Sequence, residues 1–483
     1  MSGVRRSFWL SLADSYLSMV LQLASTIVIA RILTPKEVGI FAIAAVIAAL
    51  ANMFRDFGFA EYLIQARELN ERKIRAALGM NVAMSWSMTA LLLLAAPWIA
   101  GFYHEPGVAD VLRVLALNFL IMPFGAVVQS WFRRELNYRP IVITNIVSST
   151  VSAVVAVVLA LMGHGYMSLA WSGFAGIAAT VLGSLWFRPR GFPRWPGLSG
   201  MAEVFHFGKY ASGIYVLGQM GRGAPELIIG RVAGAADVGM FSRASSVVEL
   251  LRRLLERPVM QVCLPYFAKV ERERGSVAQA YTSSVSLITG AGWPALACLA
   301  VGAWAMIRIV YGEQWLDAVP LARILCLMCA IEMLTMLSRE ALLAVGEVRR
   351  ASVLQLEVSL LQIAGLLLVI PFGLEGASWG LVLAAVAAFA VSQRRLRQHI
   401  GLEWPAFLRA SAGSVWLTLI TAGPLAAWAW WVPVGEHNFG RWAPVATVLC
   451  MTAWLAGCKW LHHPLWDELR SGLSRLRLLL KAA

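Results

Sequence analysis

Charged side chains within long apolar segments are the residues of this sequence that could do chemistry. The clearest group begins at Glu249, because Arg252 and Arg253 follow it by three and four residues, and Glu256 follows Arg252 by four. On a helix this spacing places the four side chains next to one another. Guanidinium groups bind phosphate through paired, charge-assisted hydrogen bonds. The group could therefore bind an anionic ligand, or its members could simply pair with one another.

A second group lies in the sequence Gly-Arg-Gly-Ala-Pro-Glu, where Arg222 and Glu226 are one helical turn apart. The neighbouring glycines and proline favour a bent or interrupted helix. Arg222 is a candidate for anion binding. Glu226 is a candidate either for pairing or for coupling to a proton or sodium ion, and the sequence does not decide between these roles.

Ionised side chains are expensive within a membrane, at roughly 2.5–3.5 kcal/mol each on insertion scales, so they are expected to face one another or a wet cavity. The charged residues of the second half of the chain contain an excess of arginine, which favours a cationic cavity. The candidate residues are Arg55, Arg222, Arg243, Arg252 and Arg253 for binding an anion, and Asp14, Glu226, Glu249 and Glu256 for ion coupling or pairing.

The apolar segments around these charges predict membrane-spanning helices. The chain has 483 residues, of which 59% are hydrophobic and 14% charged, and its mean hydropathy is +0.68. Soluble domains carry roughly 25% charged residues, and a helix needs about 20 apolar residues to cross a bilayer. We therefore predict an all-α polytopic membrane protein with about fourteen transmembrane helices. Their approximate ranges are 8–30, 38–58, 77–100, 111–131, 141–162, 166–187, 208–230, 238–264, 283–310, 318–344, 352–371, 375–393, 410–432 and 442–461.

Basic residues alternate between the two sides of this predicted topology. Nearly all Lys and Arg residues of the connections fall on alternate connections, beginning with Arg5 and Arg6 and ending in the C-terminal tail. Cytoplasmic loops of membrane proteins carry such an excess of positive charge. We therefore predict that both termini lie in the cytoplasm. The net charge of +14 then reflects membrane topology and does not indicate binding to nucleic acid.

One stretch of sequence occurs twice. Val28–Ala44 aligns without a gap with Ile228–Ala244, at an offset of 200 positions. Each copy has an apolar run, a turn and a second apolar run, which predicts a tight turn between two membrane helices. Chains of two similar halves are common among secondary transporters. The equivalent positions include Arg31 and Arg231, and Gly39 and Gly239.

We expect two six-helix lobes that repeat one fold, followed by two further helices. A Pro- and Gly-rich segment separates the sixth and seventh predicted helices. The tail has leucines at helical spacing with Arg and Lys between them, as is typical of a helix on an anionic membrane surface, although an ordinary cytoplasmic helix would look similar. The predicted parts are residues 1–187 for the N-lobe, 188–207 for a cytoplasmic linker, 208–398 for the C-lobe, 399–463 for the last two helices and 464–483 for a basic amphipathic cytoplasmic tail.

The sequence has no motif of a soluble enzyme or an ATPase. It has no Walker loop, no Gly-x-Ser-x-Gly elbow and no His-Glu-x-x-His, and its predicted external connections are too short for a globular domain. Cys326 and Cys329 have no second pair with which to bind zinc, so we interpret them as core residues. We predict that the chain is not an enzyme and holds no metal or cofactor.

The repeated turns and the segments after them resemble Wzx-type polysaccharide flippases, which belong to the multidrug/oligosaccharidyl-lipid/polysaccharide (MOP) exporter superfamily. The resemblance extends over roughly residues 8–400. It rests on Arg31–Phe41, Asp56–Gly58, Leu63–Gln65, Ile229–Arg231, Val238–Phe241 and Leu264–Pro265.

The resemblance implies a flippase of the bacterial inner membrane. Such a protein carries a polyprenyl-diphosphate-linked oligosaccharide to the periplasmic leaflet by alternating access, for the synthesis of O-antigen, capsule or exopolysaccharide. Its partners would be membrane lipids and polysaccharide polymerase or export proteins. Coupling to an H⁺ or Na⁺ gradient or to the membrane potential stays open. The alternatives are a multidrug cation antiporter of the same superfamily, a lipid II flippase, and a glycan polymerase or ligase.

Overall fold

The computed structural model shows a chain built from helices. In the part of the chain that it describes, every regular element is an α- or 3-10 helix, which confirms the predicted all-α fold class. The chain divides into two compact units, Met1–Met240 and Phe241–Ala483, and each is described by itself. The described residues are 2–56, 59–65, 70–193, 195–202, 206, 221, 223–432 and 439–471.

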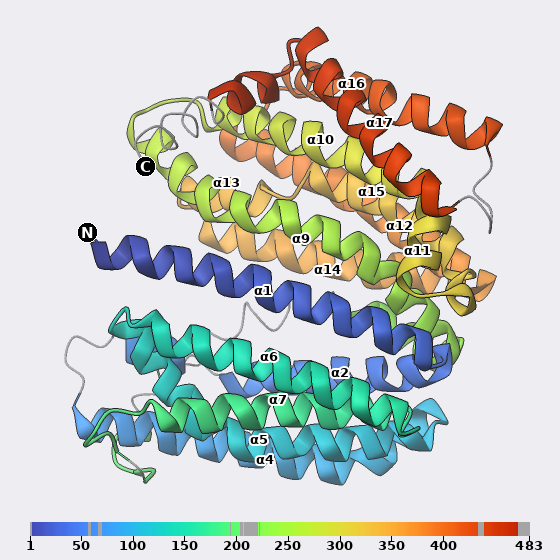
Figure 1. Cartoon of the computed structure of the whole chain (residues 1–483). Coiled ribbons are helices and arrows are strands. Elements are labelled where there is room, and N and C mark those ends of the chain that lie inside the picture. The colour runs from blue at the N-terminus through green and yellow to red at the C-terminus, as the bar shows by residue number, and fades with distance from the viewer. Residues whose placement is uncertain are drawn as a thin grey trace. The chain divides into compact units, whose positions relative to one another are not determined.

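The first unit contains a bundle of helices, all of them long except α3 (Figure 1). They are α1 (Ser2–Ile32), α2 (Pro35–Asp56), α3 (Phe59–Gln65), α4 (Glu71–Tyr103), α5 (Pro106–Arg134), α6 (Tyr138–Leu161) and α7 (Met167–Trp186). In this bundle α5 packs against α4, α7 and α2, while α6 packs against α7 and α1. A further helical segment, residues 223–232, also belongs to this unit.

Local sequence signals fix the start of α2. The backbone N–H and the hydroxyl of Thr34 both donate to Oε2 of Glu37 at 2.8 Å. The N–H of Glu37 donates to the Thr34 hydroxyl at 3.4 Å, which completes a capping box. Pro35 is suited to the first helical position, because the N–H that it lacks would have no partner there. The motif Thr-Pro-Lys-Glu therefore begins α2 directly after the turn.

Both copies of the repeated sequence form a tight turn with matching hydrogen bonds. The N–H of Leu33 donates to the carbonyl of Ile29, and the N–H of Ala233 donates to the carbonyl of Ile229. Donors and acceptors both differ by 200 positions, which is the offset of the sequence repeat. The structure thus places the predicted turn in each copy, and in the same register.

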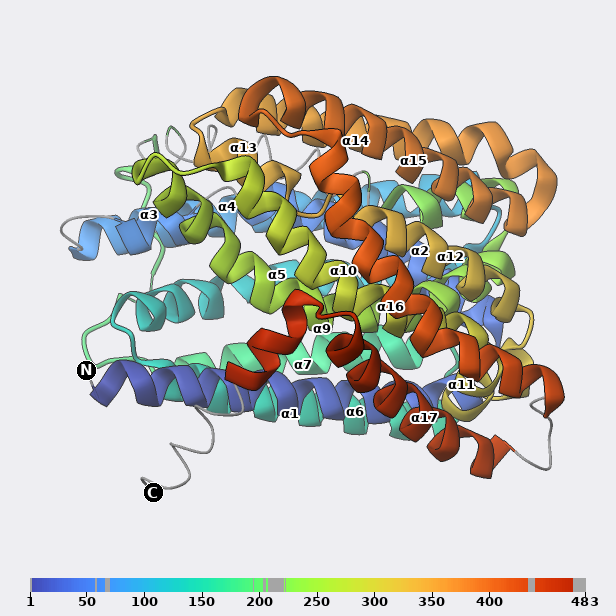
Figure 2. The same ribbon diagram turned by 90° about the horizontal axis from the view of Figure 1, so that it is seen from above.

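The second unit contains the helices from α9 onward, although α9 begins in the first unit (Figure 2). In this unit α14 packs along α15, α15 on α12, α10 between α12 and α16, and α16 along α17. The elements are α9 (Ala235–Arg272), α10 (Val277–Val301), α11 (Ala303–Val310), η1 (Glu313–Trp315), α12 (Ala318–Met333), α13 (Ser338–Ala344), α14 (Val348–Val369), η2 (Ile370–Phe372), α15 (Gly373–Ile400), α16 (Trp404–Trp431) and α17 (Phe439–Trp460).

Nine helical stretches among the described residues are long and apolar enough to cross a membrane, or ten if the bent pair after α16 counts as one. One of them, Val348–Ile400, contains both α14 and α15. The predicted helix 283–310 is interrupted at Gly302, where α10 ends and α11 begins. Most of the predicted helix 208–230 lies outside the described residues. The count of fourteen and the lobe boundaries stay predictions.

His463 closes the turn that follows α17. It is 3% exposed, its Nδ1 accepts from the N–H of Leu465 at 3.3 Å, and its Nε2 lies 3.2 Å from the hydroxyl of Ser414. Because Nδ1 accepts a backbone N–H, the ring is neutral, with its proton on Nε2. The helix Pro464–Ser471 leaves this turn at 106° to Trp442–Trp460. The rest of the predicted tail, 472–483, lies outside the described residues.

Acidification should weaken this anchor. Burial lowers the pKa of His463, so neutral His463 stabilises the fold above the unfolded pKa of about 6.5, and this contribution is lost as the pH falls toward the lower folded pKa. We expect the thermal midpoint of the wild type to fall below about pH 6.5 relative to that of His463→Asn, whose side chain does not titrate. A difference between the two proteins that stays constant with pH would contradict this role.

Candidate functional site

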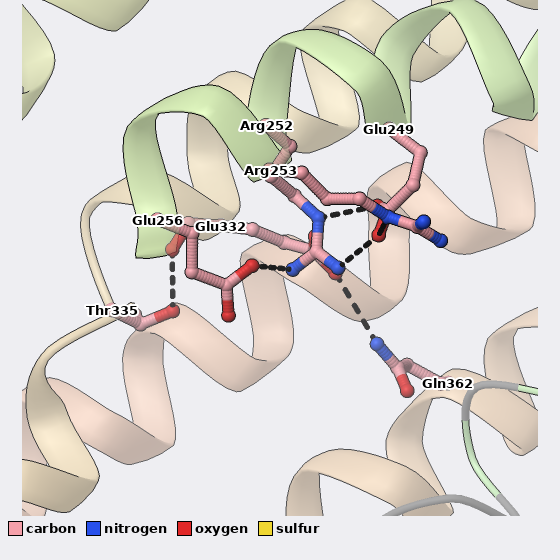
Figure 3. A network of polar contacts seen from close by, with 7 residues as sticks. All are labelled: Glu249, Arg252, Arg253, Glu256, Glu332, Thr335 and Gln362. Atoms are coloured by element: carbon pink, nitrogen blue, oxygen red, sulfur yellow. Dashed lines mark hydrogen bonds and ion pairs between the residues drawn. The ribbon is translucent and has the colours of Figure 1, made fainter. Parts of the chain in front are cut away.

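Arg252 lies at the centre of an ion-pair network in the second unit (Figure 3). Its Nε and Nη2 lie 2.6 and 2.9 Å from the two carboxylate oxygens of Glu249. Its Nη1 lies 3.0 Å from Oε2 of Glu256. The side chains of Arg252 and Glu256 are each only 20% exposed. This partial burial strengthens the pairing relative to an ion pair on an open surface, where water screens the charges.

Arg253 is the more available of the two arginines. Its Nε donates to Oε1 of Glu249 at 3.0 Å, while the side chain remains 57% exposed. Among the described residues, neither of its Nη groups has a hydrogen-bond partner. A guanidinium group has five N–H donors, so four remain for a ligand. Arg253 can therefore contact a phosphate group without first releasing Glu249.

Glu332 on α12 extends the network and changes its charge. Figure 3 shows its side chain close to Arg252, and its Oε1 accepts from Nε2 of Gln362 on α14 at 3.2 Å. Among the described side chains, three carboxylates and two guanidiniums leave one formal negative charge; the side chain of Arg257 lies outside them. The spacing rule that finds partners on one helix could not find Glu332 or Gln362, because these residues reach the network from helices distant in sequence.

Arg243 is on α9 but outside this network. It precedes Arg252 by nine residues, which is roughly 14 Å along the helix axis and about half a turn around it. Its guanidinium lies 5.4 Å from the ring centroids of both Tyr311 and Trp315, and the residue is 8% exposed. These cation–π contacts tie α9 to the connection between α11 and α12. The structure therefore does not bring Arg243 and Arg252 together.

The other predicted charged residues belong to the first unit. Arg55 is buried near the end of α2. Glu226 lies in the helical segment 223–232, and its Oε2 is buried with no hydrogen-bond partner among the described residues. Arg222 and the side chain of Asp14 lie outside the described residues. The roles of these four residues in binding, coupling or pairing stay predictions.

The glycines of the repeat lie where two helix starts touch in the first unit. A Cβ atom on Gly39 would lie 1.6 Å from the carbonyl oxygen of Ala235, and one on Gly239 would lie 1.9 Å from that of Pro35. The contact is reciprocal, because Pro35 and Ala235 also occupy equivalent positions of the repeat. Only glycine, which has no Cβ, allows backbones to approach this closely.

The arginines of the repeat lie in the last turns of the preceding helices. Arg31 and Arg231 are both exposed, and the Arg231 guanidinium lies 5.0 Å from the ring centroid of Phe102 on α4. Positive charge at a helix C-terminus is favourable, and an exposed cation–π contact adds about 0.5–1 kcal/mol. These contacts support the turns.

The described residues contain no group of three or more His, Cys, Asp or Glu side chains placed to hold a metal ion. All six cysteines, including Cys326 and Cys329, are free thiols.

The fold of this chain is shared with solved membrane transport proteins. The structure is similar to that of the lipid II flippase MurJ in an inward closed conformation, over 95% of this chain and 99% of MurJ, with a TM-score of 0.76 and 12% identity. It is also similar to an inward-facing multidrug resistance MATE family transporter of the MOP superfamily, over 82% and 96% of the two chains, with a TM-score of 0.64 and 16% identity. The chain has the fold of the MOP transporters.

Sequence comparison then gives the family. Residues 28–320 match the family described as polysaccharide biosynthesis protein, and the chain belongs to it. It is 24% identical over 467 residues to the teichuronic acid biosynthesis protein TuaB of Bacillus subtilis, covering 94% of this chain and 93% of TuaB. It is 23% identical over 312 residues to the lipopolysaccharide biosynthesis protein WzxC of Escherichia coli, covering 63% of each chain. These findings confirm the resemblance predicted from the repeated turns.

Proposed function

We propose that this protein is a flippase of the bacterial inner membrane. It moves polyprenyl-diphosphate-linked oligosaccharide repeat units from the cytoplasmic to the periplasmic leaflet, for polysaccharide biosynthesis. The observation that carries the proposal is membership of the polysaccharide biosynthesis protein family, together with similarity to TuaB along nearly the whole chain. The MOP fold supports a transporter that works by alternating access.

The network on α9 supports the binding of a diphosphate in this proposal. The exposed Nη groups of Arg253 make the first contact. A diphosphate bound there competes with Glu249 and Glu256 for Arg252, because each carboxylate uses guanidinium donors that phosphate oxygens also accept from. Anion binding at this site therefore requires these carboxylates to move aside or to take up protons.

Transport by this protein also requires an energy source, partner molecules and a defined membrane topology. An H⁺ or Na⁺ gradient or the membrane potential drives transport. Membrane lipids surround the helices, and polysaccharide polymerase or export proteins receive the translocated glycan. The distribution of basic residues between connections supports placing both termini in the cytoplasm.

Depletion of this protein tests the proposal directly. We expect cells that lose it to accumulate a complete oligosaccharide repeat unit on polyprenyl diphosphate, since assembly on the cytoplasmic leaflet continues while translocation stops. Mass spectrometry of the lipid extract measures this accumulation and identifies the sugars. A re-expressed wild-type copy, as the control, should return the pool to its original size.

The other outcomes of that experiment point to different functions. A truncated glycan on the lipid would indicate a missing enzyme, and accumulation of lipid II would indicate a lipid II flippase. An unchanged lipid-linked pool with increased sensitivity to cationic drugs would indicate a multidrug antiporter. The antiporter is the second candidate, because the described side chains of the network, which come from α9 and α12, include three carboxylates against two guanidiniums, and this balance suits a cationic ligand.

A further inference from the structure

Residues 192–201, which belong to the predicted linker, lie against the start of α4 in the first unit (Figure 1). The N–H of Gly197 donates to the carbonyl of Arg75 at 2.9 Å. A Cβ atom on Gly79 would lie 2.3 Å from the carbonyl oxygen of Gly197, so α4 and this linker segment meet backbone to backbone. Arg194 lies outside the described residues. The linker segment is thus held on α4 at its middle.

Apolar side chains hold both ends of the linker segment. Phe192 and Met201 pack against the buried cluster that contains Ile74 of α4. Phe192 also makes an edge contact with Trp131 of α5, at 6.2 Å between the ring centroids. Residues 76–81 of α4 are all buried, which means that this stretch is covered on every side of the helix. The linker segment is therefore packed as part of the first unit, and it is not a free tether.

Two large apolar side chains of this packed segment remain exposed. Trp195 is 74% exposed and Leu198 is 85% exposed, and they lie on either side of Gly197 in the sequence. Both are held in place, because the backbone between them is bonded to α4. An exposed apolar pair on a fixed backbone is a surface that fits an apolar partner.

The position of the linker segment along α4 indicates that this partner is the membrane. The charged residues of α4 all lie in its first turns, with none from 76 to 103, and are Glu71, Arg72, Lys73 and Arg75. Trp98, which is 83% exposed, follows Gly79 by 19 residues, or roughly 29 Å along the helix. That distance matches a hydrocarbon core of ~30 Å, and tryptophan is enriched at both of its boundaries. The linker segment therefore lies at one boundary when Trp98 lies at the other.

The charges near the linker segment favour an anionic surface. Residues 188–202 include three arginines and no acidic residue. Arg72 of α4 and Arg190 of the linker are both exposed. Basic residues beside an apolar anchor are attracted to the anionic lipids of the cytoplasmic leaflet, and the predicted topology places this end of α4 on the cytoplasmic side. Depth and charge thus favour a lipid surface over a soluble protein.

We propose that residues 192–201 are a membrane anchor of the first unit. The side chains of Trp195 and Leu198 insert at the level of the lipid headgroups and upper acyl chains of the cytoplasmic leaflet, while the basic residues around them stay in the headgroup layer. This part of the linker then remains attached to the first unit and to the lipid throughout any conformational change. The inference rests on the packing of the first unit and does not depend on which substrate is transported.

Spin-label accessibility in lipid vesicles tests this contact. The label is attached to Leu198→Cys in a variant whose six native cysteines are replaced by serine, and the protein is reconstituted into vesicles of phosphatidylethanolamine and phosphatidylglycerol. Interfacial apolar groups reach about 5–10 Å into the headgroup and acyl boundary, so collisions with oxygen, which concentrates in lipid, should exceed those with a water-soluble nickel chelate by at least about fivefold. A label on Trp195→Cys should show the same order.

The matched control is Glu273→Cys, whose side chain is 65% exposed and follows the 38-residue helix α9. A label there should collide mainly with the nickel chelate. Two outcomes at position 198 would overturn the proposal. Collision mainly with the nickel chelate would show a surface open to water, as a docking site for a soluble protein would be. Shielding from both reagents would show that protein covers the surface.

Displacing the linker segment provides a second test. Gly79→Ala places a methyl group 2.3 Å from the carbonyl oxygen of Gly197, so the segment should separate from α4 and the label at position 198 should become more mobile. Gly101→Ala, on the same helix with nothing within 4 Å of its Cβ, should leave the spectrum unchanged. Identical spectra for the two variants would contradict the fixed position of the segment, on which the anchor depends.

Discussion

Replacing Gly39 by alanine should strongly destabilise the protein, and Gly239→Ala should have the same effect. The new methyl groups would lie 1.6 Å from the carbonyl oxygen of Ala235 and 1.9 Å from that of Pro35. A backbone oxygen cannot rotate away as a side chain can, so the two helix starts would have to separate. Overpacking typically costs about 1–3 kcal/mol, and we expect the upper end of this range or more.

Thermal unfolding of the protein in detergent measures the effect, and two other glycines provide the control. Gly101 on α4 and Gly173 on α7 are helical, and a Cβ atom on either would meet nothing within 4 Å. Alanine at these positions should be neutral or stabilising by about 0.5–1 kcal/mol, because it is the better helix former. If Gly39→Ala and Gly239→Ala behaved like these controls, the close approach of the two helix starts would be wrong.

The turns of the repeat were predictable because their signals are local. Thr34 and Glu37 form a capping box, with Pro35 at the first helical position between them, and the structure contains its hydrogen bonds. The contact between Gly39 and Gly239 was not predictable in the same way. The sequence shows that both positions are glycine, but the reason, a backbone oxygen from a segment 200 residues away, becomes visible only in three dimensions.

The candidate site likewise contains contacts that local spacing predicts and contacts that only the tertiary structure reveals. Helical spacing predicts the pairing of Arg252 with Glu249 and Glu256, because all three lie on α9. Arg243 was a candidate for the same cationic cavity because it is an arginine within a predicted span, whereas its side chain contacts Tyr311 and Trp315 about half a helical turn away from the network. The sequence shows an excess of arginine over acidic residues within the predicted helices of this half of the chain. The balance among the described side chains of the network is nevertheless negative, because tertiary packing brings in a carboxylate from α12.

Arg252 is partly buried and the adjacent Arg253 is largely exposed, so replacing each should have a different effect. Arg252→Met should sharply reduce the amount of folded protein, because Glu256 loses the guanidinium with which it pairs and Glu249 keeps only Arg253. Removing one partner of a fully buried ion pair typically costs about 3–5 kcal/mol, and this partly buried network should lose less than that but more than a surface pair. Arg253→Met should leave folding nearly unchanged, because its side chain is largely exposed, but should reduce glycan output if Arg253 contacts the diphosphate.

The double variant Arg252→Met with Glu256→Gln separates charge burial from ligand binding. It replaces the Glu256 carboxylate together with the guanidinium that pairs with it. The double variant should therefore recover most of the folded protein that Arg252→Met loses. Abundance is measured by size-exclusion chromatography from membranes, and glycan output in the same cells. Recovery of both would make Arg252 a purely structural residue, whereas recovery of abundance without output would assign it to the diphosphate site. If Arg252→Met alone were as abundant as the wild type, the network would not hold α9 in place, and its carboxylates would already be neutral or hydrated.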